Sequence, residues 1–131
     1  MASIVAQIDA PDEVRSLIFR AGGRVYVCDV EVVREVVPLT LVTRLPGAPK
    51  FVRGLANVRG TIVTVIDAGA YLHGCPCVED GMVMLVDMGA QTVGLLVSAV
   101  ANVRSVRDDE GYEQLDVRAL VARVVVTTED E

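Results

Sequence analysis

Residues Phe51 to Asp67 constrain the fold of this chain most, because they form two apolar, β-branched runs joined at Arg59-Gly60. Glycine adopts the positive φ that a tight hairpin requires, at a position where most residues would be strained. We therefore predict a β-hairpin whose tip carries Arg59 and the short amide Asn57. A charged tip on an apolar ribbon is the first candidate for a recognition element in this sequence.

Composition indicates a small, mainly β protein. The chain has 131 residues and a mass of 14.0 kDa, enough for one compact domain or for two very small barrels with a shared interface. Apolar residues make up 52% of it but aromatic residues only 4%, so aliphatic side chains must fill the core. Valine is the commonest residue and favours strands, because its branched Cβ packs well on a pleated surface.

The charge pattern argues against nucleic-acid binding and against a transmembrane helix. The net charge is −6 and Lys50 is the single lysine, whereas nucleic-acid binding needs clustered cations. Charged residues interrupt every apolar run well before the roughly 18 to 20 residues of a membrane span. Residues 1–11 lack the basic and apolar regions of a secretory signal, so we expect a cytoplasmic protein. Three cysteines, an odd number, argue against a disulfide framework.

Alternating apolar and polar residues, together with turn residues, predict the other elements. We expect a helix over 68–72 capped by Asp67, an irregular boundary over 73–81, a charged loop over 107–114 and a helix over 115–121. The expected strands are 14–20, 24–29, 39–44, 82–88, 92–97, 99–106 and a terminal strand at 124–126. Residues 30–37 are expected to form a short helical turn that runs into a strand.

Six short motifs stand in a fixed order along the first half of the chain. They are Gly22-Gly23, Val33-Arg-Glu35-Val36, Pro46-Gly-Ala-Pro49, Val52-Arg-Gly54-Leu55, Asn57-Val-Arg-Gly60 and Val65-Ile-Asp67. Each motif alone is common, but their order and spacing together resemble the CheW family of coupling proteins from bacterial chemosensory arrays. A later hairpin with Gly89 in its turn extends the resemblance to about residue 103.

The resemblance implies a fold and a non-enzymatic role. The expected fold is a single CheW-like domain over 1–131, built from two small SH3-like β-barrels packed side by side. We place the subdomains at approximately 14–67 and 82–126, with a linker at 73–81. Such a protein binds the cytoplasmic tip of a chemoreceptor and the regulatory domain of a CheA-type histidine kinase, with no catalysis and no cofactor.

The second barrel departs from the family pattern. The family places a further glycine-containing strand pair between the region of Val103 and the last helix, whereas here 107–114 leads directly to Leu115. An unpaired strand edge would invite pairing with another chain, so we expect either a covering helix at 115–122 or a homodimer. A shortened protein that caps the array, or competes within it, is therefore an alternative to a bridging one.

The resemblance also assigns candidate partner-binding residues. Arg59 corresponds to the family's receptor-facing arginine, and Glu35 to a glutamate that would hold the guanidinium in one orientation. The remaining candidates are Asn57, Val33, Gly54 and Val100. Without the family spacing, Arg59 would be an ordinary surface arginine, the two valines core residues and Gly54 a site of close backbone approach.

The segment from His73 to Cys77 suggests a metal site or a redox site. It contains three potential ligands, but Cys-x-Cys is not the usual spacing of zinc cysteines and a second pair of ligands is missing. We therefore favour an ordinary pair of loop thiols, and keep a small β-barrel ligand or metal sensor as the alternative. The sequence has neither the GxxxxGK[ST] nor the GxGxxG pattern of phosphate-binding loops, which argues against nucleotide-dependent enzymes.

Overall fold

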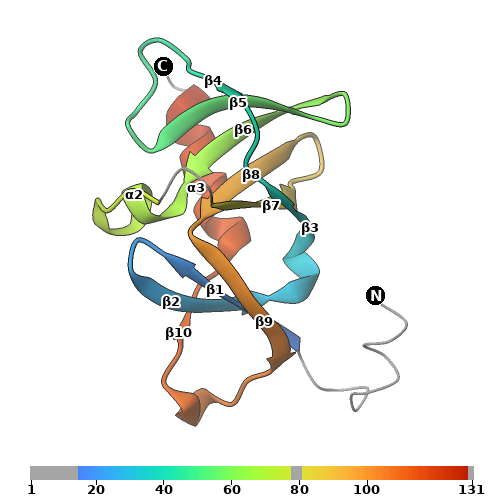
Figure 1. The fold of residues 1–131 in the computed structure, drawn as a ribbon, viewed down its shortest axis with the longest axis vertical. Coiled ribbons are helices and arrows are strands. Elements are labelled where there is room, and N and C mark those ends of the chain that lie inside the picture. The colour runs from blue at the N-terminus through green and yellow to red at the C-terminus, as the bar shows by residue number, and fades with distance from the viewer. Residues whose placement is uncertain (1–14, 78–80, 130–131) are drawn as a thin grey trace.

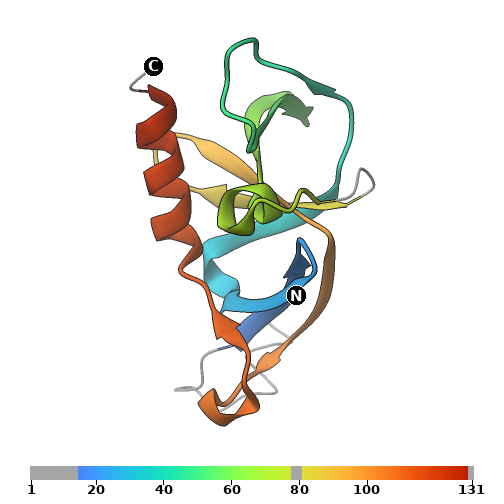
Figure 2. The same cartoon turned by 90° about the vertical axis from the view of Figure 1, so that its left-hand side faces the viewer.

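The computed structural model describes residues 15–77 and 81–129 and shows a mainly β fold with a helix along one side (Figures 1 and 2). The strands are β1 (Arg15–Ala21), β2 (Arg24–Asp29), β3 (Val33–Pro38), β4 (Val42–Thr43), β5 (Val52–Val58), β6 (Thr61–Asp67), β7 (Met82–Asp87), β8 (Thr92–Val97), β9 (Ala99–Ser105) and β10 (Glu113–Gln114). The helical elements are η1 (Val30–Val32), α2 (Ala68–His73), η2 (Asp108–Glu110) and α3 (Val117–Glu129).

The strands form two sheets. A four-stranded sheet has the order β10-β2-β1-β9, and a six-stranded sheet has the order β3-β7-β8-β6-β5-β4. The sequence motifs predict the hairpins β1–β2, β5–β6 and β7–β8 because each pairs neighbouring strands across a short turn. Pairing of β1 with β9, and parallel pairing of β6 with β8, joins distant segments. The subdomains expected at 14–67 and 82–126 would therefore share both sheets.

One apolar core lies beneath both sheets and α3. It contains Phe19 from the smaller sheet, Leu95 from the larger sheet and Leu120 from the helix, each with 0% of its surface exposed. Burial of apolar surface is the main favourable term in folding, so a shared core makes the two sheets depend on each other for stability.

The side chain of Asp67 links three segments that the fold brings together. Asp67 is 1% exposed, and its Oδ1 accepts a hydrogen bond from the backbone N–H of Ala70 at 3.0 Å, which confirms the predicted helix cap. Both carboxylate oxygens also accept the N–H of Cys77, at 3.1 and 3.0 Å. Arg53 on β5 lies 3.4 Å from Oδ2 through Nε, and its Nη2 donates to the Cys77 carbonyl at 2.9 Å. We call these contacts the Asp67 clip.

The C-terminal region differs from the sequence prediction. The terminal strand expected at 124–126 is wrong, because α3 continues through these residues to Glu129. Val117, Leu120, Val121 and Val124 are buried with helical spacing, so packing of one helix face overrides the strand propensity of the valine run. The loop expected at 107–114 also contains η2 and the short strand β10, which pairs with β2 in parallel.

A pair of serine substitutions distinguishes a helix from a strand here. In a strand, residues 122 and 124 would share a face, whereas in α3 Ala122 is exposed and Val124 is buried. We expect Val124→Ser to lower the free energy of unfolding by about 1–3 kcal/mol and Ala122→Ser by less than about 0.5 kcal/mol. Urea denaturation measures both values, and equal losses would argue against the helix.

A helix is present where one was predicted for 115–122, because α3 begins at Val117. Within the described residues β9 nevertheless stands at an edge of its sheet, and β10 covers β2 over only two residues. The homodimer therefore remains a prediction, which sedimentation over a range of concentrations would test. Among the residues that the structure describes, none of the helices is both long and apolar enough to cross a membrane.

Candidate protein-binding site

The β5–β6 hairpin ends in a tight turn with an unusual backbone. Val58 pairs with Thr61, so Arg59 and Gly60 are the two turn residues, with φ of 53° and 88°. Positive φ at both positions is the type I′ geometry, which matches the right-handed twist of the strands. The Oδ1 of Asn57 accepts the Gly60 N–H at 2.8 Å and fixes the turn. Gly60 was expected to have positive φ, whereas the same conformation at Arg59 was not.

Arg59 is joined to Glu35 by a two-pronged ion pair. Nη1 of Arg59 donates to Oε1 of Glu35 at 2.8 Å, and Nη2 lies 2.7 Å from Oε2. Glu35 is on β3, at the other side of the six-stranded sheet in strand order, where it pairs with Leu85 of β7. The two planar groups therefore meet fork to fork, an arrangement that sets direction as well as distance.

The exposure of the pair decides what it can do. The Arg59 side chain is 70% exposed and that of Glu35 is 27% exposed. Because the pair is accessible to solvent, it contributes only about 0–1 kcal/mol to folding. An L-residue with positive φ is also strained by roughly 1–2 kcal/mol relative to glycine. Arg59 thus adds little to stability. The ion pair holds its guanidinium group at a fixed position on the tip, where the N–H groups not used by Glu35 can serve as donors to a partner.

Gly54 has a structural reason to be glycine. It lies on β5 with φ of 139°, and a Cβ at this position would overlap the carbonyl oxygen of Thr43 on β4. The residue is buried, so a partner cannot contact it directly in this conformation. Its assignment as a partner-binding residue stays a prediction, and close approach of β4 to β5 accounts for the glycine.

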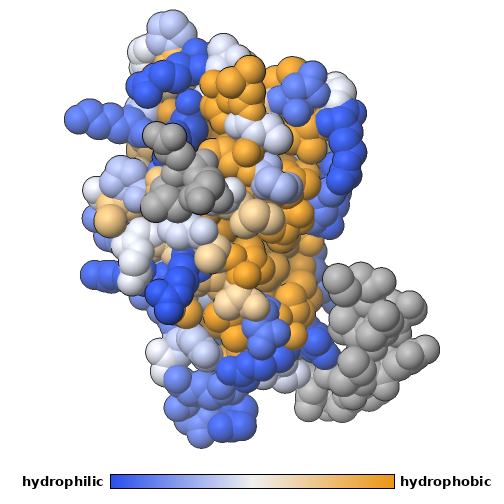
Figure 3. Space-filling model, viewed as in Figure 1, coloured by the Kyte–Doolittle hydropathy of each residue, from blue (hydrophilic) through white to orange (hydrophobic). Residues whose placement is uncertain are grey.

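Val33 and Val100 are the two apolar side chains among the sequence candidates. Both are half-buried and pack against the core, Val33 on β3 and Val100 on β9. Figure 3 shows apolar atoms gathered in a band over the middle of this face, where Figure 1 places β3, β7 and β9. The half-buried valines of β3 and β9 that pack against the core are Val33, Val36, Val37, Val100 and Val103, and we call these five residues the apolar band. The fold therefore brings Arg59, Glu35 and Asn57 into one site, with Val33 and Val100 in the band.

Two exposed apolar residues near the tip were not among the sequence candidates. Leu41 is 89% exposed just before β4, and Ile62 is 60% exposed and faces Asn57 across the hairpin. Alternation in the first part of β6, where Val63 and Val65 are buried, was the signal that would have placed Ile62 on the outer face. The tip therefore offers apolar contact beside the guanidinium.

The segment from His73 to Cys77 separates its potential ligands. Cys75 is exposed, whereas Cys77 is 4% exposed and its Sγ donates to the Leu96 carbonyl at 3.6 Å. The ring of His73 stacks on Tyr26 with centroids 6.3 Å apart. Across the described residues, no three histidine, cysteine or acidic side chains are grouped in a way that could hold a metal ion. This arrangement gives no support to the sensor alternative.

Thiol modification should distinguish the three cysteines. Burial raises the pKa of Cys28 to about 12, and burial also raises the pKa of Cys77. Because the thiolate is the reactive form, we expect iodoacetamide at about pH 8 to modify Cys75 and to leave the other two unmodified in the native protein. Mass spectrometry before and after denaturation would measure this. Rapid native modification of Cys28 would contradict the burial described above.

Comparison with known proteins identifies the family. Residues 15–130 match the family model described as a CheW-like domain. The chain belongs to this family. The expected mainly β fold is confirmed by its likeness to the crystal structure of the scaffolding protein TtCheW from Thermoanaerobacter tengcongensis, with its two SH3-like β subdomains. The TM-score is 0.68 at 28% sequence identity, over 78% of this chain and 68% of TtCheW.

Curated relatives agree with this assignment. The chemotaxis protein CheW of Klebsiella aerogenes is 32% identical over 72% of this chain, and that of Rhizobium meliloti is 34% identical over 72%. Protein PilI of Pseudomonas aeruginosa is 32% identical over 87% of this chain. The matches span 58% and 63% of the two CheW relatives and 65% of PilI, so this CheW-like chain corresponds to part of their length.

Proposed function

We propose that this CheW-like chain is a non-enzymatic coupling scaffold. It joins the cytoplasmic tip of a chemoreceptor to the regulatory domain of a CheA-type histidine kinase, in the cytoplasm. Family membership supports the general role, since CheW-family proteins are scaffolds and adaptors in chemosensory signalling. The single structural observation that carries the proposal is the exposed Arg59 fork, held by Glu35 on a strained turn.

The geometry of the tip suits recognition of a polar protein surface. A guanidinium that is already oriented loses little conformational entropy when it binds a carboxylate or a carbonyl group. Ile62, which faces Asn57 across the hairpin, is exposed and would bury its apolar side chain against a bound partner. Backbone strain at a residue that stabilises the fold little is typical of a functional position. We therefore assign Arg59, Glu35 and Asn57 to a partner interface, with Val33 and Val100 of the apolar band as further contacts.

A capping role is the second candidate, and the short β9–α3 connection favours it. The residues between β9 and α3 form only η2 and the two-residue β10. If this region is one of the two partner surfaces, the chain binds one partner well and the other poorly. Such a protein would occupy array positions without linking receptor to kinase.

Titration of two purified partners would separate these functions. The partners are a receptor cytoplasmic fragment and the isolated kinase regulatory domain, each added to the full chain in a calorimeter. The scaffold predicts binding to both partners, and the cap predicts binding to one. Binding to neither would remove the coupling proposal. Arg118→Glu, at an exposed arginine on α3, is the matched charge control for substitutions at Arg59.

A further inference from the structure

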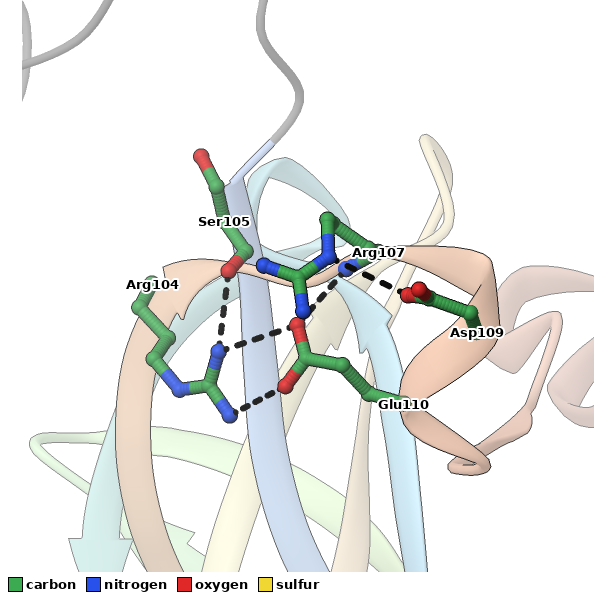
Figure 4. Close-up of polar contacts among 5 residues, drawn as sticks. All are labelled: Arg104, Ser105, Arg107, Asp109 and Glu110. Carbon is green, nitrogen blue, oxygen red and sulfur yellow. Dashed lines mark hydrogen bonds and ion pairs between the residues drawn. The ribbon is translucent and has the colours of Figure 1, made fainter.

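The connection between β9 and α3 lies well away from the β5–β6 hairpin in Figure 1, and it contains the ion-pair network drawn in Figure 4. Arg104, near the end of β9, donates through Nη2 to Oε1 of Glu110 at 2.8 Å and through Nη1 to Oε2 at 3.3 Å. Nη1 also donates to the Ser105 carbonyl at 3.1 Å, and the backbone N–H of Arg107 donates to Oε2 of Glu110 at 2.8 Å. The Glu110 carboxylate thus ties the end of β9 to the start of η2.

A second ion pair in the same turn supplies an internal control. Arg107 lies 3.1 Å from Asp109, but these side chains are 78% and 77% exposed. The side chains of Arg104 and Glu110 are 39% and 17% exposed. A fully solvated pair contributes little, whereas a partly covered carboxylate with several charge-assisted bonds resists opening. The contacts of Glu110, rather than the exposed Arg107–Asp109 pair, therefore hold this turn closed.

The turn places the next residues against the smaller sheet. Gly111 has φ of 83° and reverses the chain after η2. The ring centroid of Tyr112 then lies 5.9 Å from the guanidinium carbon of Arg104. Glu113 and Gln114 form β10 opposite Tyr26 and Val27 of β2. The N–H of Leu115 donates to the Val27 carbonyl at 2.9 Å, directly before α3 begins. We call residues 106–115 the strap.

The strap pairs with β2 over fewer residues than β1 does. β10 has two residues and both are exposed, whereas β2 pairs with β1 from Asp29 to Arg24. Short, exposed pairings open at a low free energy, independently of the core. The fold can therefore lose the β10 pairing while the sheets stay intact.

We propose that the Arg104–Glu110 ion pair is a latch that keeps the strap closed on β2, and that its release frees the β2 edge without unfolding the protein. A free edge presents unpaired backbone donors and acceptors. The latch thus governs local opening at the end of the molecule where this chain departs from the family pattern. The inference concerns the strap alone and does not depend on the proposed function.

Acid should open the strap. Bonds from Arg104 first, and from the Arg107 N–H next, lower the pKa of Glu110 to about 2 from 4.5. The groups that face Glu110 are the guanidinium of Arg104 on β9, Arg107 at the start of η2 and, through Arg104, the ring of Tyr112. Since the folded pKa is depressed, the stabilisation is complete above about pH 4.5 and is lost as the pH falls towards about 2.

Native-state hydrogen exchange of the full chain tests the latch. Glu110→Gln keeps an acceptor for the Arg107 N–H but removes the charge, and Asp109→Asn removes the charge of the exposed pair. We expect Glu110→Gln to speed exchange of the Leu115 amide by about three- to tenfold, with amides of Ile66 and Leu95 unchanged. Asp109→Asn should leave all three amides as in the wild type.

Two results would overturn the latch. Unchanged exchange at Leu115 in Glu110→Gln would show that the ion pair does not hold the strap. A parallel rise at Leu115, Ile66 and Leu95 would show that the pair acts on global stability. Arg104→Lys keeps the charge but loses the fork, and it provides a second variant if Glu110→Gln does not fold. The latch predicts faster exchange at Leu115 alone in that variant too.

Discussion

Replacing Asp67 with alanine is expected to lower the free energy of unfolding by about 2–4 kcal/mol. The carboxylate is 1% exposed and accepts the N–H groups of Ala70 and Cys77, so its removal leaves buried donors unpaired. Arg53 would lose its ion-pair partner as well, but it still donates to the Cys77 carbonyl, and its side chain is 28% exposed, so water can hydrate it. The loss therefore comes mainly from the unpaired backbone groups rather than from the ion pair.

Urea denaturation of Asp67→Ala beside Asp87→Ala gives a matched comparison. Asp87 also accepts a backbone N–H, from Gly89 at 3.0 Å, but it is exposed at the β7–β8 turn. We expect Asp87→Ala to cost less than about 1 kcal/mol, because water replaces the lost bond. If the two variants lost equal stability, the Asp67 clip would not organise the junction of β6, α2 and the following loop.

Replacing Arg59 with asparagine is expected to weaken partner binding by at least about tenfold while leaving stability unchanged or raised by up to about 1 kcal/mol. Asparagine tolerates the positive φ of this turn, so the substitution removes the guanidinium and relieves strain at once. Calorimetric titration with the receptor fragment and the kinase domain, together with thermal unfolding, measures both effects. A loss of stability equal to the loss of binding would make Arg59 a structural residue.

A charge swap separates recognition from pairing. Arg59→Glu removes both the ion pair with Glu35 and the cation at the tip. Arg59→Glu combined with Glu35→Arg restores an opposite-charge pair but leaves a carboxylate at the exposed position. We expect the double variant to bind partners as weakly as Arg59→Glu does, since we propose that the partner contacts the cation at the tip. Recovery of binding in the double variant would assign the effect to the pair itself.

Local patterns predict those parts of the fold that local interactions determine. The β5–β6 hairpin depends on alternation and on Gly60, and the α2 cap depends on Asp67 standing just before the helix. Both features need only neighbouring residues, so the sequence indicates them directly. The pairing of Arg59 with Glu35 required knowledge of the family spacing, because Glu35 is on β3 and the β5–β6 turn that carries Arg59 joins strands that are not neighbours of β3 in the sheet.

The remaining features depend on contacts between distant segments. The valines after Val121 favour a strand locally, and burial of the helix face from Val117 to Val124 against the shared core makes them helical. No periodic pattern in the sequence indicates that β10 pairs with β2 in parallel. The same is true of the contacts that Arg53 and Cys77 make with Asp67. Alternation within the strand expected at 39–44 would place Leu41 on the same face as the half-buried Leu39, so its 89% exposure could be found only in the folded chain.

Kinase activation in a reconstituted mixture tests the coupling scaffold most directly. Receptor cytoplasmic fragments and a CheA-type kinase would be assayed for phosphorylation without this chain, with the wild-type chain, with Arg59→Glu and with the Arg118→Glu control. For a coupling scaffold that uses Arg59, we expect the wild type and Arg118→Glu to raise kinase activity, whereas Arg59→Glu should leave it at the level without the chain. No activation by the wild type, or equal activation by Arg59→Glu, would contradict it.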